Sequence, residues 1–141
     1  MAKREFGPRQ EQVEAVLLQI RQMTREQALV AGNAALRKNP ADLEETLTAV
    51  KLDLTRDRAE HWANARAAAS DAVRAAAYHN DGLHYTKIGD ESQLPWGVAR
   101  AAARDAVAAI AVADILEPRN LAFLTDSLQT IGIAIQESTK P

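Results

Sequence analysis

Hydrophobic residues recur along most of the chain with the three-to-four-residue spacing of amphipathic helices. In the first such segment the apolar positions are Val13, Val16, Leu17 and Ile20. Pro8, just ahead of them, suits the first turn of a helix. Thr24 and Gln27 have the spacing of a capping box, which predicts that a second helix begins at Arg25. One unbroken helix through Thr24 is the alternative.

A third helical pattern begins at Asn39, which can cap a helix, and Pro40, which the first turn tolerates. Its apolar positions form a heptad-like seam made of Leu43, Leu47, Val50 and Leu54. No glycine or proline follows before Gly82, so the pattern predicts one helix of nearly forty residues, about 55–60 Å long. The alternative is a break near Thr55, whose hydroxyl can cap a new helix.

The segment 78–95 is dense in glycine, asparagine, aspartate and serine, which predicts a long irregular connector. After it, Pro95 opens an alanine-rich helix that we expect to run to about Leu116. Glu117 and Pro118 break that helix, and a last helix is predicted from about Arg119 to Ile135.

One stretch of sequence occurs twice. Trp62–Val73 resembles Trp96–Val107, with Trp, Arg, Asp and Val at matching positions, and we interpret the match as an internal duplication. The alanines of each copy share one helix face, which lets two helix axes approach closely. The second copy is apolar on its other face too, as in a buried helix. We therefore expect it to be the central helix.

Composition favours the same fold. Alanine makes up about a fifth of the 141 residues, and aromatic residues make up 4%. The sequence predicts an all-α fold: one domain over residues 1–141, a helical bundle of four to six helices with one long central helix. The ends, 1–7 and 136–141, are expected to be flexible tails. The excess of alanine, and of arginine over lysine, suggests a GC-rich bacterial or phage genome.

Charge and residue content narrow the functional classes. The net charge of −2 argues against a general nucleic-acid binder, so nucleic acid is an unlikely partner, and against a polybasic membrane patch. The chain has no cysteine, which excludes a thiolate zinc site and a cysteine nucleophile. No apolar run approaches the ~20 residues of a membrane span. We therefore expect a cytoplasmic protein that does not associate with a membrane.

The connector contains the weak candidates for a metal site, His79, Asp81 and His84. Imidazole and carboxylate groups are metal ligands, but their spacing here matches no metalloenzyme motif. An Asn-Asp-Gly turn accounts for the same residues.

Two pairs of opposite charges occupy matching positions in the repeat: Arg66 with Asp71, and Arg100 with Asp105. Each pair is five residues apart, so its members do not face each other on one helix. Antiparallel packing of the repeats would pair Arg66 with Asp105 and Arg100 with Asp71. We interpret the four as interhelical ion pairs rather than as a ligand site.

No phosphate loop and no nucleophile elbow occurs, so we expect no enzyme activity and no cofactor. The leucine seam offers a surface for a partner helix. We expect a non-enzymatic interaction or assembly factor of regulatory, immunity or phage type, as a homodimer or bound to another protein. One alternative is a metal- or small-ligand-binding protein, even an enzyme, centred on His79–Glu91. The other is a helical DNA-associated regulator, which the acidic Asp42, Glu44 and Glu45 disfavour.

Overall fold

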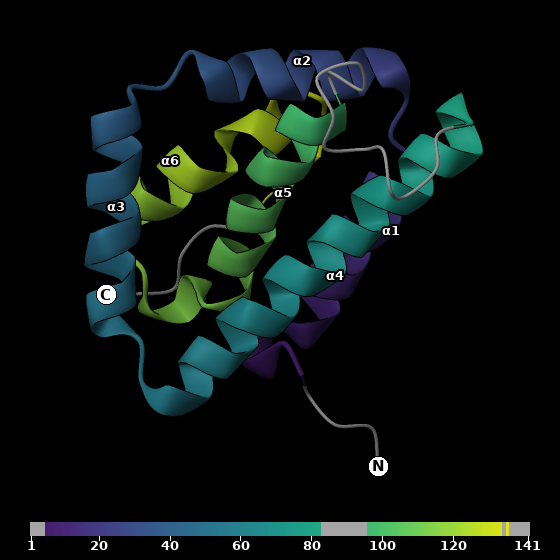
Figure 1. Ribbon diagram of the computed structural model, residues 1–141. Helices are drawn as coiled ribbons and strands as arrows, with labels where there is room; N and C mark the ends of the chain where they lie inside the picture. Colours follow the sequence, from purple (N-terminus) through teal and green to yellow (C-terminus); the bar gives the residue numbers. More distant parts are fainter. Residues whose placement is uncertain (1–4, 83–95, 134, 136–141) are drawn as a thin grey trace.

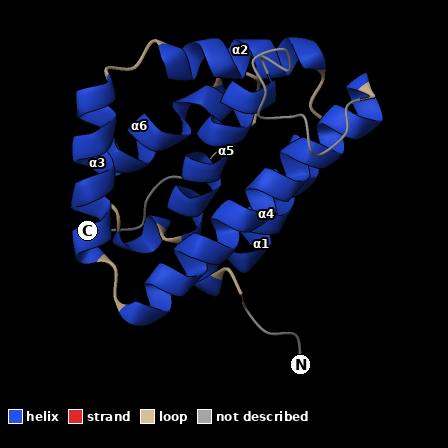
Figure 2. Ribbon diagram, in the orientation of Figure 1, coloured by secondary structure: helices blue, strands red, loops and turns tan. Residues whose placement is uncertain are grey.

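The computed structural model describes residues 5–82, 96–133 and 135, and its regular structure there is entirely helical (Figures 1 and 2). The α-helices are α1 (Gln10–Arg21), α2 (Arg25–Leu36), α3 (Pro40–Asp53), α4 (Arg56–Asp81), α5 (Trp96–Ala111) and α6 (Pro118–Gln129). Two short 3-10 helices, η1 (Gly7–Arg9) and η4 (Ala113–Ile115), precede α1 and follow α5. The predicted all-α bundle is confirmed.

Two helix starts lie where the capping residues predict them. The Thr24 hydroxyl accepts a hydrogen bond from the Gln27 backbone N–H at 3.2 Å, and the Gln27 side chain accepts one from the Thr24 N–H at 3.0 Å. This reciprocal pair begins α2 and separates it from α1. The Asn39 side chain caps α3 by accepting from Ala41 N–H at 2.8 Å.

The prediction of one helix over nearly forty residues is wrong, and the alternative break is observed. Leu54 has extended backbone angles, and the Thr55 hydroxyl accepts a hydrogen bond from the Arg58 backbone N–H at 3.3 Å. That bond caps a new helix, so the chain turns between α3 and α4 (Figure 1). The longest element is therefore α4, with 26 residues.

The ends of several segments also differ from the prediction. Helix α4 continues through Asp81, so residues 78–81 of the expected connector are helical, and Gly82 ends the helix in the left-handed conformation. The rest of that connector, 83–95, lies outside the described residues. Helix α6 ends at Gln129, short of Ile135, where the chain turns towards Gly132 at positive φ.

The N-terminal tail is shorter than expected. Phe6 and Gly7 are buried, and Phe6 belongs to the hydrophobic core. The Phe6 backbone N–H donates to the Gln10 side chain at 2.9 Å, which fastens this segment to the start of α1. Residues 1–4, like 136–141, lie outside the described part of the chain.

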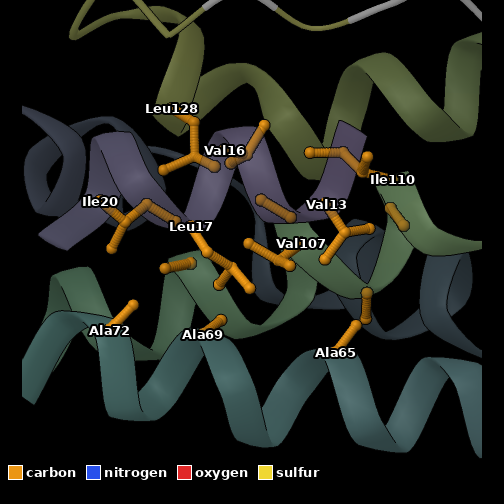
Figure 3. Packing of buried hydrophobic residues seen from close by; sticks show 14 of the residues in the cluster. Val13, Val16, Leu17, Ile20, Ala65, Ala69, Ala72, Val107, Ile110 and Leu128 are labelled. Atoms are coloured by element: carbon orange, nitrogen blue, oxygen red, sulfur yellow. The ribbon is translucent and has the colours of Figure 1, made fainter. Parts of the chain in front are cut away.

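Helices α2, α3 and α4 form three sides of a frame, with α5 and α6 inside it and α1 beside α4 (Figure 1). Helix α5 contacts α1, α2, α4 and α6, and every residue from Ala106 to Ala113 is buried. This is the all-round burial that its apolar sequence predicts. Figure 3 shows the alanines of α4 turned towards α1 and α5: Ala65, Ala69 and Ala72.

The internal duplication is not confirmed as a structural unit. Trp62 lies inside α4, whereas Trp96 is the first residue of α5. Both tryptophans are buried, and α4 packs against α5. The duplication thus stays an interpretation of the sequence.

Candidate functional site

Helices α4 and α5 run antiparallel, and side-chain contacts along their length fix the register. Arg58, near the start of α4, lies 2.5 Å from Asp114, just after the end of α5. Asp81, the last residue of α4, accepts a 2.8 Å hydrogen bond from the indole Nε1 of Trp96, the first of α5. Residues near the middle of one helix therefore face the middle of the other.

The four charged residues of the repeat are not paired symmetrically. Arg66 Nη2 lies 3.8 Å from Asp105 Oδ1, across the two helices. Asp71 lies 4.0 Å from Arg74 on its own helix instead of meeting Arg100. One of the two cross-helix contacts in the sequence interpretation is thus present, and the other is replaced by a contact within α4.

Four arginines gather along the α4–α5 junction: Arg66, Arg74, Arg100 and Arg104, called here the arginine cluster. All four are only partly exposed. Burial lowers the pKa of the Arg100 guanidinium, and the positive charges of Arg74 and Arg104 lower it further. Arg100 therefore lies close enough to both Arg74 and Arg104 to be repelled by them.

The carboxylate of Asp105 lies among these cations, 3.8 Å from Arg66. Burial raises its pKa, although the positive charges of Arg66, Arg104, Lys38 and Lys51 act in the opposite direction. Its Oδ1 is buried and accepts no hydrogen bond from the described residues. Asp105 and Asp71 are two carboxylates beside four guanidiniums, so they compensate only part of the positive charge.

The leucine seam proposed as an interaction surface faces the chain's own core. Val50 is buried, and Leu43, Leu47 and Leu54 are half-buried against the same core. Helix α3 packs on α6, so α6 takes the place of the partner that the seam suggested. The leucine that α3 does present to solvent is Leu52, which is 82% exposed.

The three candidate metal ligands differ in their surroundings. Asp81 already accepts hydrogen bonds from Arg25 Nη1 at 2.7 Å and from Trp96 at 2.8 Å, so it joins α2, α4 and α5. His79 is exposed with its ring edge-to-face with Tyr78, and His84 lies outside the described residues. In the described ranges, no three His, Asp or Glu side chains are grouped closely enough to hold a metal ion.

An apolar surface on α2 was not predicted. Leu29 and Leu36 are 48% and 68% exposed, and they line a groove of about 360 Å³ with Gly32 and, from α5, Val98. Gly32 permits this close packing of α2 on α5, since a Cβ there would lie 3.3 Å from Val98 Cγ1. The seven-residue separation of the two leucines was the available sequence signal.

Comparison with known proteins gives no relative from which a function could be transferred. No protein-family model matches the chain, and no curated protein or solved structure matches it. Among the helices of the described residues, none combines the length and the apolar character needed to cross a bilayer. A function must therefore be argued from the surfaces of this chain alone.

Proposed function

We propose that this chain is a non-enzymatic protein-interaction factor that self-associates through α2. The observation that carries the proposal is the pair of exposed leucines, Leu29 and Leu36, beside an apolar groove. Apolar surface gathered in this way on a soluble domain commonly marks a protein-interaction site. The leucine seam on α3 is already covered, which leaves α2 as the better candidate surface.

The occupant that fits best is a second copy of the same helix. Leu29 and Leu36 are two helical turns apart, about 10.5 Å along the axis. If two α2 helices pack antiparallel about a two-fold axis near Gly32, Leu29 meets the partner's Leu36. In the same register Glu26 and the partner's Arg37 are offset by about 3 Å along the axis, which their long side chains can span, and both of these residues are exposed. Such a face is complementary to itself, as a two-fold interface requires.

The apolar surface that the dimer buries determines its expected affinity. Leu29 and Leu36 are 48% and 68% exposed, so burying the four leucines of a dimer contributes roughly 3.5–7 kcal/mol, at ~1.5–3 kcal/mol for each fully exposed leucine. The loss of translational and rotational freedom offsets much of this gain. We therefore expect a reversible dimer with a dissociation constant in the micromolar range or weaker.

Light scattering coupled to size exclusion tests the proposal over protein concentrations from ~10 to ~500 µM. We expect the mass to rise from monomer to dimer over this range. Leu36→Glu should keep the protein monomeric, because it buries a charge against the partner's Leu29 in the interface. Leu52→Glu is the matched control, since it changes an exposed leucine of α3 and should leave the association unchanged.

Exchanging the charges at positions 26 and 37 tests the proposed register of the two α2 helices. Glu26→Arg and Arg37→Glu should each weaken the dimer, because each variant brings like charges together. The two changes combined should restore it. A monomeric mass throughout the concentration range would refute the proposed self-association, and dimerisation that survives Leu36→Glu would refute α2 as its surface.

A further inference from the structure

The arginine cluster is an unusual concentration of charge for a chain whose net charge is −2. Arg66 and Arg74 lie eight residues apart on α4, which places them about 12 Å apart along the helix axis. Arg100 and Arg104 are one turn apart on the antiparallel α5. The nearest carboxylates are Asp105, beside Arg66, and Asp71, beside Arg74.

The hydrogen-bonding capacity of the cluster is largely unused. The Nε atoms of Arg66, Arg74 and Arg104 are buried and have no hydrogen-bond partner among the described residues. In the part of the chain that the structure describes, the side chains of Arg100 and Arg104 make no hydrogen bond and no ion pair. A guanidinium carries five N–H donors, so the four side chains hold many donors to offer a ligand.

Packing alone does not explain these residues. Mutual repulsion of guanidiniums and burial of unpaired donors both destabilise a fold, whereas alanine or glutamine would pack here without the repulsion. The four side chains are partly exposed, so a ligand can reach them from solvent. We propose that the arginine cluster is a binding site for a compact, multiply charged phosphate ligand, such as a pyrophosphate group.

The number of acceptors favours phosphate over carboxylate. One guanidinium can satisfy both oxygens of a carboxylate with its planar fork, whereas a pyrophosphate group offers enough oxygens for several guanidiniums at once. A ligand with two phosphate groups also suits a cluster contributed by two adjacent helices.

The surrounding charge favours a compact ligand over a nucleic-acid strand. Helix α3 carries four acidic residues: Asp42, Glu44, Glu45 and Asp53. Glu11 and Glu14 add negative charge on α1, which packs beside α4. A long polyanion needs positive charge along its length, which a chain of net charge −2 disfavours, whereas a small ligand needs only the arginines.

Asp105 should weaken the binding of an anion at the arginine cluster. Its carboxylate lies among the cations and competes electrostatically with a bound anion. Asp105→Asn should therefore tighten binding of phosphate ligands, by about three- to tenfold for removal of one nearby charge. A site that only balances the protein's own charges would show no such gain in affinity.

Isothermal titration calorimetry with inorganic pyrophosphate tests the site at low salt, ~20 mM. We expect saturable binding with one ligand per chain, which weakens as salt is raised because the attraction is screened. Arg100→Gln and Arg104→Gln should each reduce the affinity about tenfold or more. Arg56→Gln is the matched control, because Arg56 is an exposed arginine of α4 outside the cluster, and it should stay within about twofold of the parent protein.

Thermal melting of the same variants separates loss of ligand contacts from loss of structure. Removing one of several repelling charges should leave the melting temperature unchanged or raise it. Arg100→Lys keeps the charge but not the guanidinium fork, and it should bind pyrophosphate more weakly than the parent protein.

Several outcomes would overturn the proposal. The proposal is wrong if the protein shows no saturable binding up to ~5 mM pyrophosphate at low salt. It is also wrong if both glutamine variants bind pyrophosphate as tightly as the parent protein. Equal affinity for citrate would assign the site to carboxylates instead. Tighter binding of a twelve-nucleotide single strand than of pyrophosphate would assign it to nucleic acid.

Discussion

The indole Nε1 of Trp96 donates a 2.8 Å hydrogen bond to the carboxylate of Asp81, which joins the first residue of α5 to the last residue of α4. Arg25 of α2 donates to the same carboxylate at 2.7 Å, and the neighbouring Asn80 side chain donates to the Met23 carbonyl oxygen at 2.9 Å. Three helices therefore meet at the end of α4. Asp81, one of the candidate metal ligands in the sequence, holds this junction together with its neighbour Asn80.

Removal of the Asp81 carboxylate should destabilise the fold. In Asp81→Ala the N–H of the fully buried Trp96 loses its acceptor, and the expected cost is about 1–3 kcal/mol. Urea unfolding followed by circular dichroism measures it. His79→Ala, an exposed position one turn away at most, serves as the control and should change the free energy of unfolding by less than about 0.5 kcal/mol. Equal losses in both variants would contradict the assigned role.

The same junction predicts acid sensitivity. The hydrogen bond from Trp96, then the hydrogen bond and charge of Arg25, lower the pKa of Asp81. The folded state thus favours the charged form, so this contribution is complete above the ordinary aspartate pKa and is lost as pH falls through the lowered value. Asp81→Asn should reduce stability at pH 7 and narrow its difference from the parent protein towards pH 2. A difference independent of pH would argue against a charged Asp81.

Asp105 should show the opposite pH dependence. Burial raises its pKa, so the fold favours the neutral form. Its contribution to stability therefore falls as pH rises from the ordinary aspartate pKa through the raised one. Asp105→Asn should raise the melting temperature at pH 7 and leave it nearly unchanged at pH 3. Differential scanning calorimetry at both values checks this, and a lower melting temperature at pH 7 would contradict it.

Helix starts were predictable because they depend on local chemistry. The hydroxyl of Thr24 and the amide of Asn39 cap the backbone of residues next to them in sequence, and both boundaries were predicted. The break at Thr55 was ambiguous, since no glycine or proline marks it. The backbone at Leu54 is extended although leucine is a good helix former, so local propensity alone does not predict the break.

Surfaces were harder to predict than helices. The seam from Leu43 to Leu54 identifies an apolar stripe, but its spacing does not say whether the chain or a partner covers it. The structure covers it with the core and leaves Leu29 and Leu36 exposed instead. The arginine cluster was equally hidden, because Arg66 and Arg74 of α4 approach the arginines of α5 only once the two helices pack antiparallel.

Arg58 should be the most sensitive charged residue of α4. It contacts both oxygens of Asp114, at 3.0 and 2.5 Å, and donates to the Ala111 carbonyl oxygen at 3.1 Å, with its side chain only 14% exposed. Arg58→Ala should therefore cost about 2–4 kcal/mol, because it leaves Asp114 and a carbonyl without a donor. Arg56→Ala, exposed at the start of the same helix, is the comparison and should have little effect. Chemical denaturation of the two variants distinguishes them.

Gly7 should not tolerate a side chain, for two separable reasons. Its φ of +76° is unfavourable for other residues, and a Cβ would lie 2.5 Å from Nδ1 of His61 on α4. Gly82 has a similar φ of +67° but open space around it, so Gly82→Ala isolates the conformational cost, about 1 kcal/mol. Gly7→Ala should cost about 2–4 kcal/mol, since the clash displaces His61 or the N-terminal segment as well. In the His61→Ala background the additional cost of Gly7→Ala should fall to that of Gly82→Ala. Thermal and urea unfolding of these four variants measure the coupling, and independent effects at positions 7 and 61 would show that the N-terminal segment does not pack against α4.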